Sequence, residues 1–505
     1  MISEDSKKLR LNVLFSLLYQ ITVVVSGFIL PRLILQYYGS EINGLVSSIT
    51  QFLSVISLAQ MGVGAVVQAA FYKPIADGDD KKVSQIFTSS NRFFNTIAIL
   101  LLIYVSGLIF LYPRLNNIHY DFCFTAMLIV SIAINAYSQY YIGITYRILL
   151  NAMQYMYIQS VIGIITTTLN VGISVFLMNA GYSIAWVKFI GALVFLMQPI
   201  AIMLVVKSKT SINTQEKYDK EPIEQKWNGL AQHVAFVIFE NTDIIVLTLF
   251  STYKNISIYA VYNLVTNGIR LAINSLTEGV KSLLGKLYAE GKQRELQNFF
   301  GYYEWIMHVS VTVIFSLCAV LISPFAKVYT KGILDANYNQ PLFGVVMSLG
   351  IMFFCIRLPY LGMVTSAGMF KETQSSAIIE AVINIVLSMS FVCIFGLVGV
   401  AIGTLVGILY RLVYFVLFLK NNILYRSPLI FVKLIILDLV LFILTVITSY
   451  FFKMHSISYI AWIYLAIKQS IVVIIISLAV NFIFYNNYFN VLIRKVLKRE
   501  NNNLL

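Results

Sequence analysis

Acidic side chains inside long apolar stretches are the first residues of this sequence that could do chemistry. Glu240 and Asp243 lie in the apolar stretch 229–250, three residues apart, so a helix places them on one face; His233 lies seven residues before Glu240 and roughly shares that face. Two close carboxylates can hold a proton or a sodium ion, because their repulsion raises the pKa of one of them. We therefore expect Glu240 and Asp243 to form an ion-coupling site.

Basic and amide side chains in other apolar stretches predict a binding site for an anion. Polar residues recur at three- and four-residue steps from Asn267 to Lys281, which makes a polar stripe on one helix. A guanidinium stays charged and donates paired hydrogen bonds to phosphate, and ionisable groups within a membrane usually face a water-filled cavity or a bundle interior. The predicted substrate-binding residues are Arg32, Arg270, Arg357, Asn274 and Lys281.

Each of these groups also has a structural interpretation. Arg270 could pair with Asp243 and only lock two helices together, and Arg357 has the same alternative. Arg32, which follows Pro31, could extend to the outer membrane surface, because a long basic side chain can reach the interface from within a helix.

Other charged residues predict structural roles only. Asp438 and Lys468 fall at similar depth in the last two apolar stretches, which favours a salt bridge between them. Arg411 and Lys433 lie near the ends of their stretches and are expected to reach the polar interface.

Composition places these residues in a membrane protein. Of 505 residues, 59% are hydrophobic and 11% are charged, with a mean hydropathy of +0.81, whereas soluble domains carry about 25% charged residues. The net charge of +14 could indicate nucleic acid, but the basic residues lie mainly in alternate loops, so membrane topology explains it and no nucleic-acid partner is expected.

Catalytic and metal-binding patterns are not found in the sequence. It contains no P-loop, no G-x-S-x-G and no triad, and its four histidines are scattered without metal-ligand spacing. We predict no enzymatic activity, no catalytic residue, no metal site and no cofactor, with a proton or sodium ion as the candidate coupling ion.

Fourteen apolar runs are long enough to cross the hydrocarbon core, which takes about 20 residues. With the N-terminus inside, 24 of the 36 lysines and arginines fall in cytoplasmic loops and flanks and 5 fall outside, so both termini are predicted to be cytoplasmic. The runs are 11–36, 44–72, 88–112, 121–142, 157–179, 183–206, 229–250, 258–287, 301–323, 341–366, 375–395, 398–419, 429–452 and 458–487.

A repeat with a nearly constant offset organises these runs. Ala76-Asp77-Gly78 recurs as Ala289-Glu290-Gly291 at an offset of 213, and Asn170 recurs as Asn384 at an offset of 214. The sequence therefore predicts an all-α polytopic protein of two parallel six-helix repeats plus two C-terminal helices. The predicted parts are a first lobe at 1–206, a cytoplasmic linker at 207–228, a second lobe at 229–420, and two extra helices with a basic tail at 421–505.

Several segments resemble the polysaccharide-exporter and O-antigen-type oligosaccharide flippases. The stretch 35–89 includes L-Q-Y-Y-G-S-E-I-N-G and resembles the N-terminal signature of that family. Asn241-Thr242-Asp243 resembles the polar start of its seventh helix. The stretch 357–407, with R-L-P-Y, S-A-G-M-F-K-E-T-Q and F-G-L-V-G-V-A-I-G-T, is the best match. Arg32, Asp243 and Arg357 match the family pattern, whereas Arg270 is assigned by position alone.

This resemblance implies membership of the multidrug/oligosaccharidyl-lipid/polysaccharide exporter superfamily, with a V-shaped pair of six-helix lobes that work by alternating access. It implies a flippase in the bacterial inner membrane that moves undecaprenyl-pyrophosphate-linked oligosaccharide for capsule, O-antigen or exopolysaccharide assembly. The implied partners are this lipid-linked oligosaccharide, membrane lipids, a polysaccharide polymerase and its chain-length machinery.

Three other functions remain open from the sequence. A cation-coupled multidrug exporter would use the Glu240 and Asp243 pair, and a peptidoglycan-precursor flippase would also have 14 helices. A membrane polysaccharide polymerase usually needs a large outer loop, and the longest one expected here, at 323–340, holds no obvious acid–base pair.

Overall fold

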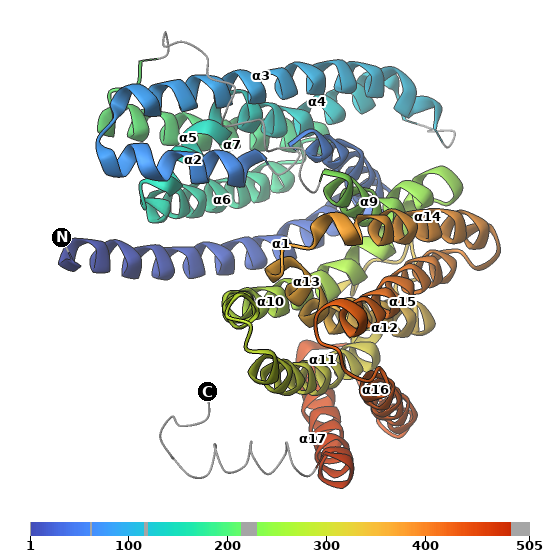
Figure 1. Ribbon diagram of the computed structural model, residues 1–505. Helices are drawn as coiled ribbons and strands as arrows, with labels where there is room; N and C mark the ends of the chain where they lie inside the picture. Colours follow the sequence, from blue (N-terminus) through green and yellow to red (C-terminus); the bar gives the residue numbers. More distant parts are fainter. Residues whose placement is uncertain (1, 61–62, 116–119, 214–229, 486–505) are drawn as a thin grey trace. The chain divides into compact units, whose positions relative to one another are not determined.

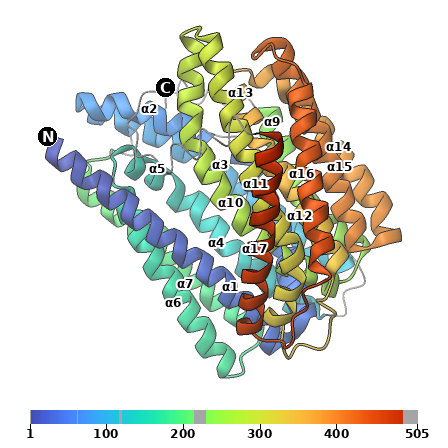
Figure 2. The same cartoon turned by 90° about the horizontal axis from the view of Figure 1, so that it is seen from below.

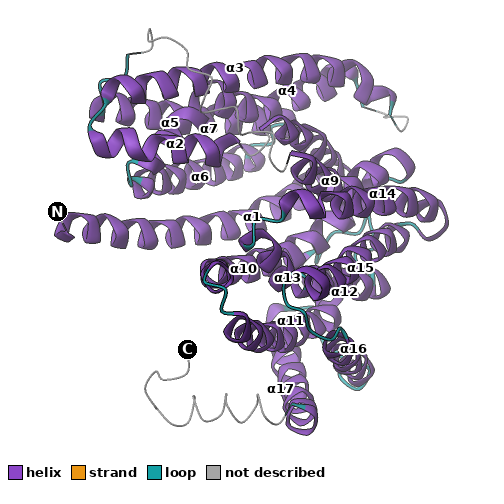
Figure 3. Ribbon diagram, in the orientation of Figure 1, coloured by secondary structure: helices purple, strands orange, loops and turns teal. Residues whose placement is uncertain are grey.

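The computed structural model describes residues 2–60, 63–115, 120–213 and 230–485, and this part of the chain is helical without strands (Figures 1 and 3). Most of the predicted linker at 207–228 and the basic tail from 486 onward lie outside the described residues. Thirteen helices of the described chain are long and apolar enough to cross a membrane. The protein is therefore an all-α, multi-pass membrane protein, as the sequence predicts.

The first repeat is built from a series of helices in chain order. These are α1 (Ile2–Ser54), the 3-10 helix η1 (Val55–Gln60), α2 (Val63–Asp77), α3 (Asp80–Leu111), the 3-10 turn η2 (Tyr112–Arg114), α4 (Phe122–Ser138), the π-helix η3 (Gln139–Gly143), α5 (Ile144–Ala152), α6 (Met156–Asn179) and α7 (Ile184–Lys209).

The second repeat and the two extra helices follow the linker. They are α9 (Leu230–Phe250), α10 (Tyr253–Ala289), α11 (Gln293–Tyr329), α12 (Pro341–Ile356), α13 (Leu358–Ser366), α14 (Phe370–Phe395), α15 (Leu397–Asn422), α16 (Leu429–Ser449) and α17 (Tyr459–Phe484).

The difference between fourteen predicted and thirteen observed spans comes from α1. It contains the predicted run 11–36 and the first part of the run 44–72, with one non-helical residue between them, Gly39, at φ 83° and ψ 177°. The later described part of 44–72 lies in η1 and α2. Only glycine adopts this conformation at little cost, so the chain bends between two helices without a polar loop. The backbone N–H and hydroxyl of Ser40 then donate to the Asp335 carboxylate at 2.7 and 2.6 Å, which satisfies the amide exposed by the bend.

The repeat seen in the sequence is also present in the backbone. Left-handed residues end corresponding helices at nearly constant offsets: Gly78 and Gly291 (φ 69° and 66°), Gln154 and Gly368 (64° and 74°), and Gly181 and Gly396 (80° and 56°). A left-handed residue just after a helix is a common way to satisfy its last carbonyls. The first two pairs also end their helices with the same backbone hydrogen bonds, whereas Gly396 has ψ −127° and shares only the sign of φ with Gly181.

Helix interruptions and packing contacts recur in the same register. The π-helix η3 ends at Gly143, and the break between α12 and α13 falls at Arg357, an offset of 214. The buried rings of Phe87 and Tyr146 lie 4.8 Å apart between centroids, and those of Phe300 and Tyr360 lie 5.7 Å apart. Both copies thus place an aromatic contact beside an interrupted helix.

Contacts group the chain into two compact units. Unit 1 comprises Met1–Ala260 with Gly332–Ala336, and unit 2 comprises Val261–Lys331 with Asn337–Leu505. The predicted boundary at 207–228 separates the two sequence copies, whereas the contacts place α9 and the start of α10 with unit 1, because α9 packs on α1. In unit 2, α16 and α17 both pack against α11 (Figures 1 and 2).

Large apolar side chains cover the outside of many helices. On α17, Ile460 is 82% exposed and Ile475 is 60% exposed, and on α16 Ile436 is 55% exposed. Water would penalise so much exposed apolar area, whereas lipid tails accept it. These faces are the membrane-contacting surfaces of the helices.

Glycines set the closest helix contacts in the bundle. A Cβ at Gly403 of α15 would lie 2.4 Å from the Ser388 hydroxyl and 2.6 Å from the Ser388 amide nitrogen on α14. Small residues at such contacts let two backbones approach within a membrane, where packing replaces the hydrophobic effect. The α14–α15 pair therefore depends on the absence of a side chain at Gly403.

We expect Gly403→Ala to lower the free energy of unfolding by about 1–3 kcal/mol, because the backbone at Ser388 must move to admit the methyl group. The measurement is the midpoint of unfolding of the purified protein in detergent. Gly107→Ala in α3 is the matched control, since its Cβ would meet no atom within 4 Å. Equal midpoints for the two variants would contradict the close approach.

Candidate binding site

The polar stripe predicted on α10 is present, and its residues differ in exposure. Arg270 is half-buried, and its Nε donates to the Asn267 side-chain oxygen at 3.1 Å. Asn274 is half-buried one turn later. Lys281 pairs with Glu278 at 2.6 Å, with about a third of its side chain exposed. This helix face therefore carries a guanidinium, an ammonium and amides in one line.

Arg270 and Arg357 converge on one aromatic ring. The guanidinium carbon of Arg270 lies 5.0 Å from the centre of the Phe354 ring, and that of Arg357 lies 4.6 Å from it. A cation near a ring face is attracted by the π electrons, more strongly where water is excluded. Phe354 thus holds two like charges near each other, and two of the predicted substrate-binding residues share one site.

A single carboxylate compensates the buried part of this site. Glu380 of α14 forms an ion pair with Arg357 and a second one with Arg411 of α15, the latter at 2.7 Å. Arg357, Arg411 and Glu380 are only 1%, 3% and 2% exposed. These contacts agree with the structural interpretation of Arg357, in which its side chain holds helices together.

The observed position of Arg411 corrects the prediction made for it. Arg411 does not extend to the interface but lies buried between α14 and α15, with its guanidinium over the Phe415 ring at 5.1 Å. A charge in a low-dielectric interior needs a partner, and Glu380 supplies one. Distance from a helix end is a poor guide here, because a nearby carboxylate stabilises the charge more directly than the interface does.

The predicted coupling carboxylates lie in unit 1. Asp243 is 8% exposed and accepts a hydrogen bond from the Tyr259 hydroxyl at 2.8 Å. Glu240 is half-buried, and its backbone carbonyl accepts from Gln51 at 3.2 Å. Gln51 also donates to the Asn241 side-chain oxygen at 2.7 Å. Amide and hydroxyl groups therefore surround this stretch of α9.

Arg32 lies in α1 of unit 1, half-buried and directly after Pro31, which stands inside the helix. A proline in a helix removes one backbone hydrogen bond, so one carbonyl in the turn before Arg32 lacks its amide partner. The substrate role predicted for Arg32 remains a prediction.

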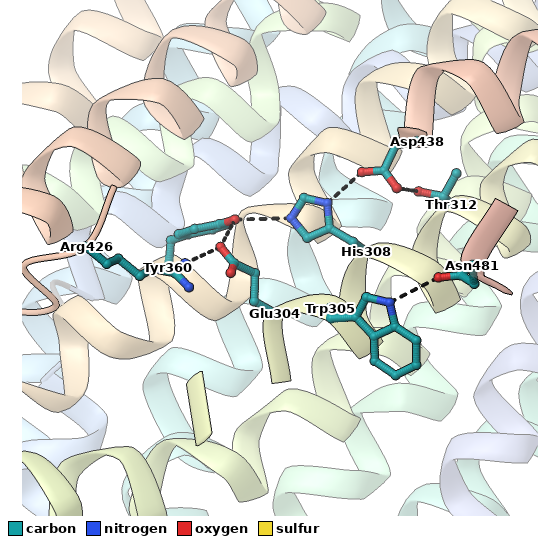
Figure 4. Close-up of polar contacts among 8 residues, drawn as sticks. All are labelled: Glu304, Trp305, His308, Thr312, Tyr360, Arg426, Asp438 and Asn481. Atoms are coloured by element: carbon teal, nitrogen blue, oxygen red, sulfur yellow. Dashed lines mark hydrogen bonds and ion pairs between the residues drawn. The ribbon is translucent and has the colours of Figure 1, made fainter. Parts of the chain in front are cut away.

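A second buried network lies between α11, α13 and α16 (Figure 4). Asp438 accepts hydrogen bonds from the His308 ring at 2.6 Å and from the Thr312 hydroxyl at 2.8 Å. The predicted salt bridge between Asp438 and Lys468 is therefore wrong, and the Lys468 ammonium lies over the Tyr464 ring at 4.2 Å. Similar depth does not bring two side chains together when their helices turn them in different directions.

Sequence reasoning missed Glu380, Glu304 and His308. Each lies within an apolar stretch, so the general rarity of ionisable residues in membrane helices could have identified them. Their partners could not be identified in this way, because Glu380 pairs with residues 23 and 31 positions away on other helices. Among the residues that the structure describes, no group of histidine, cysteine and carboxylate side chains could hold a metal ion.

No family model and no curated protein matches this sequence, but solved structures share its fold. One is described as the lipid II flippase MurJ in an inward closed conformation, with a TM-score of 0.69 at 15% identity over 94% of this chain and 100% of that one. Another is an inward-facing multidrug resistance MATE family transporter of the MOP superfamily. It has a TM-score of 0.60 at 13% identity and covers 80% of this chain and 95% of its own. A third is the MATE multidrug transporter DinF-BH, solved as a complex. It has a TM-score of 0.57 at 12% identity and covers 83% of this chain and 97% of its own.

The extent of these matches carries information about the last two helices. The flippase match covers 94% of this chain, and the part it leaves out is shorter than the segment 421–505, so the match includes part of that segment. The two MATE matches cover only 80% and 83% of the chain, so each leaves out enough to omit that segment. The chain therefore has the fold of these membrane transporters and flippases.

We expect Glu380→Gln to lower the free energy of unfolding by about 3–5 kcal/mol, because it leaves two buried guanidiniums without an anion. The yield of monodisperse protein and the unfolding midpoint in detergent are the measurements. Glu372→Gln on the exposed face of α14 is the matched control. Arg411→Met should cost less than Glu380→Gln, since the pair of Arg357 with Glu380 remains; the reverse order would rule out Glu380 as the shared counter-ion.

Proposed function

We propose that this protein is a flippase that moves undecaprenyl-pyrophosphate-linked oligosaccharide across the bacterial inner membrane for capsule, O-antigen or exopolysaccharide assembly. The observation that carries the proposal is the match to a lipid II flippase over 94% of this chain, which includes part of the segment 421–505. Both termini would then be cytoplasmic, and the lobes would work by alternating access. A polymerase and its chain-length machinery would receive the product.

The chemistry of α10 supports an anionic head group as substrate. Arg270 and Lys281 supply charges, and Asn274 supplies an amide on the same helix, all at positions that are partly exposed. A pyrophosphate offers several oxygens to such donors, and charge-assisted hydrogen bonds to it are about twice as strong as neutral ones. Arg357 would position Arg270 through the shared Phe354 ring, and Arg32 would be a further positively charged contact for the substrate.

Glu240 and Asp243 would couple transport to a proton or sodium gradient. Asp243 is nearly buried and has a tyrosine hydroxyl as a neutral partner, and a carboxylate in such a position exchanges a cation at a moderate cost. A cation-coupled multidrug exporter is the second candidate, because MATE transporters share the fold. A peptidoglycan-precursor flippase is the third, since the structure with the 94% match is named as one for lipid II.

The first test is transfer of a fluorescent undecaprenyl-pyrophosphate oligosaccharide in proteoliposomes. We expect Arg270→Ala to reduce transfer about tenfold or more, because a lost hydrogen bond to a charged group is worth about 1.5–3 kcal/mol. Arg294→Ala, an exposed arginine at the start of α11, is the matched control and should transfer normally.

The same assay separates the candidates. Export of a cationic dye with no transfer of lipid-linked sugar would assign the protein to multidrug export, and transfer of lipid II alone would assign it to peptidoglycan synthesis. Full transfer by Arg270→Ala would remove Arg270 from the binding site.

A second test addresses coupling. We expect Asp243→Asn to abolish the acceleration of transfer by an imposed proton or sodium gradient, since an amide cannot exchange a cation, while transfer without a gradient continues. Glu41→Gln, also in unit 1, serves as the control. A full gradient response in Asp243→Asn would restrict Asp243 to a structural role.

A further inference from the structure

Four ionisable groups and a tyrosine form a continuous buried line in unit 2 (Figure 4). Arg426, in the connection after α15, pairs with Glu304 of α11. The Tyr360 hydroxyl of α13 donates to the same Glu304 oxygen, and the His308 ring lies within 3.1 Å of Tyr360 and 2.6 Å of Asp438. Neither the predicted substrate site nor the predicted coupling carboxylates include any of these groups.

Assigning a hydrogen to each contact along this line gives one proton more than a neutral His308 would carry. Glu304 is the anion of the ion pair with Arg426, and its other oxygen, Oε2, has no hydrogen-bond partner among the described residues that could accept a proton from it. The single Tyr360 proton is given to Glu304, so the Tyr360 oxygen must accept from His308 Nε2. Thr312 already donates to Asp438, and His308 Nδ1 faces the other Asp438 oxygen.

Both ring nitrogens of His308 are therefore donors, which requires the imidazolium form. The charges of Arg426, Glu304, His308 and Asp438 then sum to zero, as a buried network requires. From the elements packed against His308, the ionisable groups that face it are Tyr360 of α13 and Asp438 of α16, with Glu304 on α11 itself. From α16, the uncharged Phe431 ring also lies 6.2 Å away between centroids, and Tyr485, just after α17, is a further ionisable group that lines the adjoining cavity.

A small cavity adjoins the His308–Asp438 pair and has room for a water molecule that could accept the proton. It has a volume of about 20 Å³ and is lined by His308, Asp438, Thr312, Ser477 and Asn481, among others. About 10–15 Å³ of such volume suffices for one water, provided that polar partners are present. The cavity lies between α11, α16 and α17, so the proton site borders the two C-terminal helices.

We propose that the His308–Asp438 pair is a proton-binding site that controls how many hydrogen bonds hold α13 against α11. When the pair loses one proton to water in the cavity, which borders His308 and Asp438 but not Tyr360, the proton left on the ring lies on Nδ1 beside Asp438, and the Nε2 lone pair faces the lone pairs of the Tyr360 oxygen. Tyr360 then turns its hydroxyl toward Nε2 and releases Glu304, which stays paired with Arg426. Deprotonation thus removes the contact between α13 and α11 that involves Glu304 and leaves one net negative charge in the network.

The link to transport rests on the proposed function, because α13 follows directly after Arg357, the residue that shares the Phe354 ring with Arg270. At higher pH, α13 keeps its hydrogen bond to His308 but loses the one to Glu304, which loosens this end of the binding site. We expect transfer measured at equal pH on both sides to become faster as the pH is raised.

The direct test is nuclear magnetic resonance of the full-length protein with isotopically labelled histidine at about pH 8, where an ordinary histidine with a pKa near 6.5 is neutral. We expect one imidazolium signal in the wild type, its loss in His308→Gln and in Asp438→Asn, and its retention in His455→Gln, an exposed histidine outside the network. A wild-type spectrum with only neutral rings, or an imidazolium signal that survives His308→Gln, would overturn the proton site.

The second test uses proteoliposomes from about pH 7 to well above the pH of the resonance experiment, because Tyr360 turns only after the pair has lost its proton. The wild type and His455→Gln should transfer lipid-linked oligosaccharide several-fold faster at the high end, and His308→Gln should lose most of this dependence. An unchanged pH profile in His308→Gln would overturn the link to transport. If the wild type transfers no lipid-linked sugar, the proposed function fails, whereas the resonance experiment still decides the proton site.

Discussion

The double ion pair of Glu380 is the interaction on which the organisation of unit 2 depends. One carboxylate of α14 compensates Arg357 at the break between α12 and α13 and Arg411 within α15. The hydrocarbon interior offers no water to solvate an unpaired charge, so these three helix segments must keep their rotation and depth together. The Phe354 ring and, through it, Arg270 take their positions from this arrangement.

The two repeats share a backbone and differ in their chemistry. The position of Arg357 corresponds to Gly143 in the first copy, and that of Glu380 corresponds to Thr166, both at an offset of 214. Thr166 is buried and its hydroxyl bonds to the carbonyl of Ile162 in its own helix. The helix interruption is therefore kept in both copies, whereas the buried charges belong to the second. This asymmetry makes the second copy the better place to look for recognition of a charged substrate.

Much of the fold could be predicted from the sequence, because the length of an apolar run and a constant offset do not depend on tertiary contacts. The bend at Gly39 could not, since a single left-handed glycine connects two helices without a polar loop. Side-chain partners were harder still. Asp438 pairs with His308 rather than Lys468 because helix rotation, which depth does not reveal, turns it toward α11. The two arginines of the α10–α12 site were found because charge in an apolar run stands out, but Glu380 and Arg411 show that finding a charge does not identify its partner.

The lengths of α10 and α11 make these two helices sensitive to the thickness of the lipid bilayer. Each has 37 residues, or about 55 Å at 1.5 Å per residue, against a hydrocarbon core of about 30 Å. The turn between them carries Lys286, Glu290, Lys292 and Glu295 in a set of exposed ion pairs, which belong at the level of the head groups. With this end anchored, a change in membrane thickness is absorbed by tilting of the two helices. The acyl-chain length of the surrounding lipid therefore acts directly on the helix that carries Arg270.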